Sequence, residues 1–229
     1  MIRTFKNAGL LTAAILGCTA CYGGTVFTTP PGLAPGTKYQ LVFVTVDGFF
    51  ATSSAISDYN VDVTAEAALN ATLAAFDTAN GVTWTVIGST TSVNADANAP
   101  STGLVYTLDG TEVASSGLYG GSLLSPIDID QNGNTDSTSV WTGSTTAGTV
   151  AGGINDLGQT FPEIGASGAA TGAWIASENG IESDNDLALY ALSSVITVPA
   201  ASAVPEPGTI ALTAGAFLLL GAMRRKRMV

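Results

Sequence analysis

The chain of 229 residues is 46% hydrophobic and only 11% charged, and its formal net charge is −11. Six of its seven cations lie near the two ends, so residues 25–204 set a single cation, Lys38, against 17 carboxylates, a formal balance of −16. This balance excludes nucleic-acid binding by the body, because a phosphate backbone must be neutralised by several Lys or Arg side chains. The chain has no histidine, which excludes Ser-His-Asp or Cys-His catalysis and imidazole-bound zinc.

The N-terminal residues have the pattern of a secretory signal. Arg3 and Lys6 precede the apolar run 8–17, and the small residues Cys18 and Ala20 suit a signal-peptidase site. We expect a signal peptide over 1–20 with cleavage near Ala20. Two alternatives are a lipoprotein signal ending at Cys18, which a leucine before the glycine fits poorly, and a buried core helix, which two preceding cations disfavour.

The expected extracellular body follows a Gly/Pro-rich linker at residues 21–37. The only cysteines are Cys18 and Cys21, at the signal boundary, so the body over 38–203 holds no internal disulfide and relies on an apolar core. A body of this length is sufficient for one such core.

The first elements of the body are a strand and a helix. Residues 39–46 are rich in β-branched and aromatic residues and apolar on both faces, which predicts a central strand. Residues 65–79 repeat apolar side chains at helical spacing, with Thr64 as N-cap and Gly81 at the end.

The rest of the body predicts short strands. An Asp109-Gly110 turn predicts one hairpin and Asn132-Gly133 a second. The fold class is therefore α+β, a strand-rich single domain with one main helix, plus a signal helix and a short C-terminal transmembrane helix. The expected strands cover residues 82–87, 103–108, 113–114, 122–129, 139–142, 173–175 and 187–198.

One acidic stretch has the spacing of a calcium loop. Oxygen ligands at alternate positions around a glycine turn converge on a hard cation, and this stretch begins like an EF-hand. Its twelfth position is Ser139 and not the bidentate glutamate, so a complete EF-hand is not supported. Two interpretations stay open, a turn alone, which we favour, and a calcium-assisted turn. The candidate ligands are Asp128, Asp130, Asn132 and Asp136.

The three tryptophans allow a carbohydrate-stacking hypothesis. Trp84 lies in an alternating strand and is predicted to be core, and the core is also the favoured position for Trp141 and Trp174. Trp141 and Trp174 nevertheless remain the candidate ligand residues. A carboxylate-pair glycosidase is a third possibility, because the chain has many acidic residues and such an enzyme needs two of them about 5 to 9 Å apart.

The C-terminal segment has the composition of a short membrane anchor. Residues 209–223 carry no charge and, as a helix, reach roughly 22 Å, less than the hydrocarbon core of about 30 Å. The basic tail Arg224, Arg225, Lys226 and Arg227 is expected to stay cytoplasmic, which places the body outside. Upstream of this helix stand Val204, Pro205, Glu206 and Pro207.

Together, the V-P-E-P stretch, the short apolar helix and the arginine-rich end, over residues 204–229, resemble the PEP-CTERM sorting signal of bacterial exosortase substrates. The resemblance implies delivery to the membrane, cleavage near Pro-Glu-Pro by an exosortase, and release or transfer of the body to the surface. An ordinary tail anchor is the alternative.

The stretch from "DGTEVA" through "PIDIDQNGN" to "VWTG" is similar to the endostatin-like branch of C-type-lectin-like domains, which implies an α+β binding fold. The usual disulfides of that group are absent.

These observations predict an exported, exosortase-sorted surface or matrix protein of structural or binding type, associated with extracellular polysaccharide, and not an enzyme. The expected partners are signal peptidase, exosortase, membrane lipid during sorting, and polysaccharide. A calcium-supported carbohydrate-binding module is the alternative, and the carboxylate-pair glycosidase is third.

Overall fold

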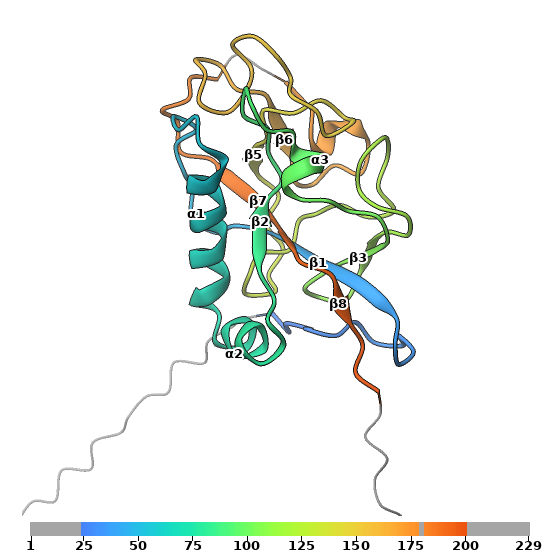
Figure 1. Ribbon diagram of the computed structural model, residues 1–229. Coiled ribbons are helices and arrows are strands. Elements are labelled where there is room, and N and C mark those ends of the chain that lie inside the picture. The colour runs from blue at the N-terminus through green and yellow to red at the C-terminus, as the bar shows by residue number, and fades with distance from the viewer. Residues whose placement is uncertain (1–23, 179–180, 201–229) are drawn as a thin grey trace, which may run out of the picture.

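The computed structural model describes residues 24–178 and 181–200, and there the chain forms one curled eight-stranded sheet with a few helices (Figure 1). The predicted mixed α+β class is therefore confirmed. The predicted signal and transmembrane helices lie outside the described residues, and no helix inside them is long and apolar enough to cross a membrane. In chain order the elements are β1 (Lys38–Val44), α1 (Ile56–Leu69), α2 (Ala71–Asn80), β2 (Trp84–Val86), α3 (Ala95–Asn98), β3 (Leu104–Thr107), β4 (Glu112–Ala114), β5 (Ser139–Trp141), β6 (Ile164–Ala166), the 3₁₀ helix η1 (Gly172–Trp174), β7 (Ala188–Ser193) and β8 (Ile196–Thr197).

Strand β1 lies in the middle of the sheet. It pairs in parallel with β3 on one edge and antiparallel with β7 and β8 on the other, within the order β4-β3-β1-β7-β5-β6. Strand β2 adds to the free edge of β7. Every residue of β1 after Lys38 is buried, because the strand has neighbours on both edges and cover on both faces.

The two faces of the sheet bury two separate hydrophobic clusters. Leu41 and Phe43 face the helices, where Phe43 packs edge-to-face on Trp84 with ring centroids 4.9 Å apart. Val42 and Val44 point the other way, into a cluster with Trp174 that loops cover. The period-2 alternation of a strand thus supplies both cores from one segment.

Two buried hydroxyls complete the antiparallel ladder between β1 and β7. At one end the N–H of Leu41 donates to Ser193 Oγ at 2.8 Å, and at the other the N–H of Leu189 donates to Thr45 Oγ1 at 2.9 Å. Ser193 and Thr45 are 1% and 0% exposed, so no water replaces these acceptors. The hydroxyls satisfy N–H groups that the ladder itself leaves without a backbone partner.

The predicted single helix over 65–79 is wrong in its start and its continuity. Helix α1 begins nine residues earlier, at Ile56, and Thr64 is inside it, with its hydroxyl donating to Asn60 O at 2.7 Å. Asn70 breaks the pattern, because its Oδ1 accepts the N–H groups of Thr72 and of the next residue and caps α2. Gly81 ends α2 in the left-handed conformation, φ 65°, as predicted.

Most predicted strands form, and three segments differ. Residues 122–129 form no strand, since Leu123 and Leu124 donate to two separate segments. Residues 173–175 fall in η1 and its C-cap, and 187–198 divides into β7 and β8. Strand β6 and helix α3 were not expected. The Asp109-Gly110 turn does join β3 to β4, with Gly110 at φ 86°.

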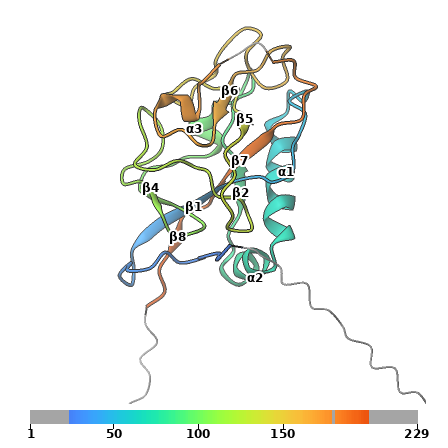
Figure 2. The same cartoon turned by 180° about the vertical axis from the view of Figure 1, so that it is seen from behind.

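Residues 24–37, expected as part of a linker, run along the sheet. The N–H of Phe27 donates to Leu108 O at 2.6 Å and that of Gly36 to Val198 O at 2.9 Å, while Val26 and Leu33 pack on the helix-side cluster. The described chain thus begins near α2 and ends just beyond β8, at the same end of the molecule (Figures 1 and 2).

Replacing Ser193 by Ala removes the acceptor for the N–H of Leu41. We expect a loss of about 1 to 3 kcal/mol in the free energy of unfolding, the cost of a buried unpaired donor. Urea denaturation measures it. Ser194→Ala is the matched control, because Ser194 accepts its hydrogen bond from Thr83 at an exposed position. Equal losses for the two variants would contradict the role assigned to Ser193.

Candidate functional site

The predicted calcium loop is a turn whose backbone N–H groups donate to the carboxylate of Asp130. The carboxylate of Asp130 is 5% exposed and accepts the N–H of Asn132 at 2.7 Å and that of Asn134 at 2.8 Å. The side-chain amide of Asn134 adds a third hydrogen bond at 3.2 Å. Gly133 occupies the left-handed region at φ 78°, as a tight turn requires. Asp130 therefore acts as the acceptor that organises the turn.

The four candidate calcium ligands converge only in part. Asn132 meets Asp130 through its backbone N–H, and Asp136 meets Asp128 through a backbone hydrogen bond of 2.6 Å. Among the described residues no group of three or more acidic or cysteine side chains is arranged to hold a metal ion. Burial raises the pKa of Asp128, and the charge of Asp109 adds to the shift. This geometry supports the turn interpretation, and calcium binding stays a prediction.

The residue between the candidate ligands reaches into a buried acidic contact. Gln131 is 1% exposed, and its amide nitrogen donates to Oε2 of Glu66 while its amide oxygen accepts the N–H of Val46 at 3.0 Å. Glu66, on α1, is 4% exposed, and Asp47, an exposed residue just after β1, lies beside it. The loop, α1 and the end of β1 therefore meet at Glu66.

This contact disfavours the charged form of Glu66. Burial raises the pKa of Glu66, the charge of Asp47 raises it further, and hydrogen bonds from the Asp47 backbone and Gln131 partly oppose the shift. Glu66 is buried beside Asp47, so a sugar does not reach between the two carboxyls as it does in a glycosidase pair held about 5 to 9 Å apart.

The tryptophans lie inside the molecule. Trp141 and Trp174 are each 0% exposed and Trp84 is 3% exposed. The ring nitrogen of Trp141 donates to Phe49 O at 2.8 Å, and the ring of Trp174 lies 5.8 Å from that of Tyr190. All three occupy the core, the favoured interpretation. Trp141 and Trp174 therefore present no ring face to a sugar in this structure.

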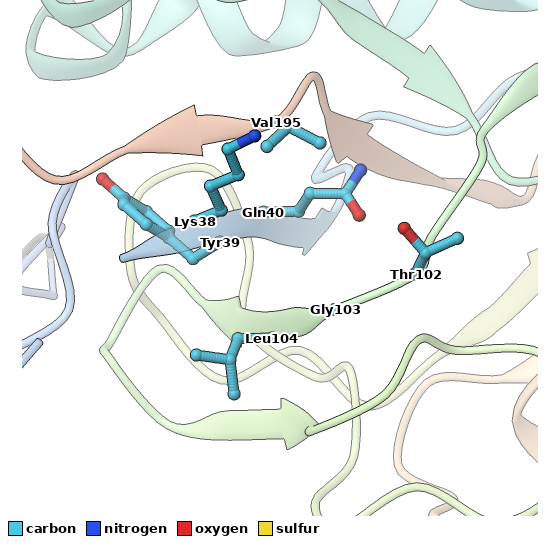
Figure 3. A pocket seen from close by; sticks show the side chains of 7 residues that line it. All are labelled: Lys38, Tyr39, Gln40, Thr102, Gly103, Leu104 and Val195. Atoms are coloured by element: carbon cyan, nitrogen blue, oxygen red, sulfur yellow. The ribbon is translucent and has the colours of Figure 1, made fainter. Parts of the chain in front are cut away.

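A pocket of about 320 Å³ opens where β1, β3 and β8 begin (Figure 3). One wall is the start of β1, and Val195, which is 57% exposed, lies across from it. Figure 3 shows the Lys38 side chain reaching toward Val195, with the Gln40 amide and the Thr102 side chain pointing toward one another at the other end. The complete lining is Lys38, Tyr39, Gln40, Thr102, Gly103, Leu104 and Val195.

Sequence reasoning missed both the pocket and the Glu66 contact. The signal in the sequence that could have led to the pocket is the isolation of Lys38 in an acidic body. Nothing marked Glu66, because a glutamate in the first turn of the predicted helix has the pattern of a solvated residue until the packing of α1 is known.

The sorting residues Val204 to Pro207 and the basic tail lie outside the described residues. No protein-family model matches the chain, and no curated protein is significantly similar to it.

Glu66→Gln tests the buried contact through pH. Glutamine mimics the protonated acid, since one terminal atom accepts from Gln131 and the other donates to Asp47. The wild type loses stability as pH rises above the ordinary value of 4.5 toward the raised pKa of Glu66, because folding then buries a carboxylate or takes up a proton.

We therefore expect the unfolding free energy of Glu66→Gln, relative to wild type, to increase as the pH rises above the ordinary glutamate value of 4.5. Denaturant titrations at several pH values measure it. Glu182→Gln, at an exposed position, is the control. A difference that does not change with pH would refute the buried-acid assignment.

Asp130→Ala tests the turn. Removing the acceptor of two half-buried N–H groups is expected to cost about 1 kcal/mol of unfolding free energy, equally in calcium and in chelator. Thermal melts in both conditions measure it. If chelator lowers the melting temperature of the wild type but not that of the variant, Asp130 is a calcium ligand and the turn-only interpretation is wrong.

Proposed function

We propose that this chain is an exported, exosortase-sorted protein of the bacterial surface or matrix, of structural or binding type and associated with extracellular polysaccharide. The observation that carries the proposal is the order of features at the C-terminus. A Pro-Glu-Pro stretch precedes an uncharged run of fifteen residues, at 209–223, and four consecutive cations follow it at 224–227. A basic N-terminus before an apolar run gives the same direction of export.

The sorting signal fits its task physically. Proline disfavours helix at its own position and at the one before it, so a Pro-Glu-Pro stretch before the apolar run suits cleavage by a peptidase. An apolar helix shorter than the hydrocarbon core is sufficient for temporary anchoring. Signal peptidase, exosortase and membrane lipid during sorting are the partners that this proposal requires.

The fold of the body suits attachment from one end. Because the described chain begins and ends at the same end of the molecule, a C-terminal tether leaves the opposite end, with the loops between β5 and β7, directed away from it (Figures 1 and 2). The surface holds many Ser and Thr residues and one cation in the body, so it is hydrated without attracting anionic polymers nonspecifically.

Processing in a bacterium that has an exosortase tests the proposal. The full chain, with an epitope tag inserted in the exposed 152–154 loop, should yield a shortened tagged body outside the cell. Deleting the exosortase, or replacing Pro205, Glu206 and Pro207 by Ala, should leave the longer membrane-bound form. Pro199→Ala, upstream of the motif, is the matched control and should be processed normally.

Immunoblots of cell fractions measure both forms. Full-length protein found soluble in the cytosol with both ends uncut would contradict the proposal.

A further inference from the structure

The pocket shown in Figure 3 differs in charge from the rest of the body. Its lining includes one cation, Lys38, and no carboxylate, whereas the body around it carries seventeen carboxylates. Lys38 is exposed, and it forms no ion pair with any residue of the described ranges. The ammonium group is therefore available to an anionic ligand.

A structural role does not account for this lysine. Charged residues often protect the exposed edge of a sheet from pairing with another chain. Lys38 does not have that task, because β1 is a central strand whose start pairs with β8 at Thr197, and the next residue pairs with both β8 and β3.

The floor of the pocket offers a fixed hydrogen-bond acceptor. Gln40 is 4% exposed, and its amide nitrogen donates to Pro100 O at 3.0 Å and to Ser193 O at 2.8 Å. Both N–H groups are thus held by the protein, while the amide oxygen accepts no hydrogen bond within the described residues. The Thr102 hydroxyl, beside it, supplies a group that both donates and accepts.

Gly103 leaves the space between these groups open. A Cβ at Gly103 would meet no atom within 4 Å, and Leu104, the next residue, pairs with Tyr39 of β1. Gly103 is therefore on the same face as Lys38 and Gln40. A side chain there would occupy the pocket without colliding with the protein.

From this geometry we infer that the pocket binds an acidic sugar residue through its carboxylate and hydroxyl groups. The ammonium of Lys38 takes the carboxylate, since a charge-assisted hydrogen bond is the strongest contact the lining can make. The amide oxygen of Gln40 and the hydroxyl of Thr102 take sugar hydroxyls. Val195 packs against the apolar side of the ring. A volume of about 320 Å³ is at the small end of ligand pockets and suits a single residue of a polymer.

The choice of a sugar, among small hydroxylated carboxylates, rests on the proposed function. The choice of an acid rests only on Lys38 and on the absence of a carboxylate from the lining.

Glucuronate and glucose are the matched probes, because they differ by one carboxylate. Ligand-observed NMR with the full-length chain in mild detergent should show glucuronate bound about tenfold more tightly than glucose. A short oligosaccharide that contains glucuronate should bind at least as well as the monomer, which distinguishes a polymer site from a site for the free acid.

Two variants and one control locate the site. Lys38→Gln should abolish the preference for glucuronate, and Gly103→Leu should weaken both sugars by filling the pocket. Thr160→Glu lowers the net charge by the same unit at an exposed loop position, and it should bind as the wild type does. Unchanged circular dichroism spectra establish that the variants are folded.

The inference is overturned if the wild type shows no glucuronate binding up to about 10 mM, a weaker affinity than this set of contacts supports. It is also overturned if Lys38→Gln keeps the preference, or if Thr160→Glu loses it equally. Failure of processing by exosortase with intact glucuronate binding refutes the proposed function and not the pocket. Normal export and processing without glucuronate binding refutes the pocket and not the proposed function.

Discussion

The antiparallel pairing of β1 with β7 is the interaction on which the rest of the structure depends. It joins the first strand of the described residues to the next-to-last one, and both strands are buried on both faces. Further strands extend this pair, β3 and β4 on the side of β1, and β2, β5 and β6 on the side of β7. In a body without disulfides, this long-range ladder takes the place of a covalent closure of the domain.

In this protein neutral polar groups hold buried segments together, a role that ion pairs have in more highly charged proteins. Hydroxyls of Thr45 and Ser193 end the central ladder, and the amides of Gln40 and Gln131 bridge buried segments. Such contacts avoid the desolvation cost of a buried charge pair, and salt screens them little. The exception is Glu66, a buried carboxyl whose pKa is raised by burial and by the charge of the exposed Asp47 beside it.

The sequence predicted what local patterns determine. The run of apolar residues in β1 has no other stable position than the centre of a sheet, and the Asp109-Gly110 turn and the helix end at Gly81 each depend on a glycine in the left-handed region. The helix start was missed because Ile56 to Val63 is rich in residues that do not favour helices, and packing against β2 and β7 together with side-chain hydrogen bonds of Tyr59 and Asn60 holds it. The break at Asn70 depends on a side-chain cap that competes with an unbroken helical pattern.

The same limit applies to the candidate sites. Asp130 could be assigned to a turn from its spacing to Asn132 and Gly133, because these contacts are local. The meeting of Glu66 with Asp47 and Gln131, and that of Lys38 with Thr102 and Val195, join segments far apart in the sequence. Only the register of the sheet and the packing of α1 bring them together.

Native-state hydrogen exchange of the full-length chain tests most directly the claim that the β1–β7 pairing closes the domain. The amides of Leu41, Thr45 and Leu189, which bond across that pair, should exchange only through global unfolding and with one common free energy. The amide of Gly148, in a loop turn, should exchange much faster. If the amides of Leu41, Thr45 and Leu189 exchange as fast as that of Gly148 while amides elsewhere in the sheet stay protected, the β1–β7 pairing does not close the domain.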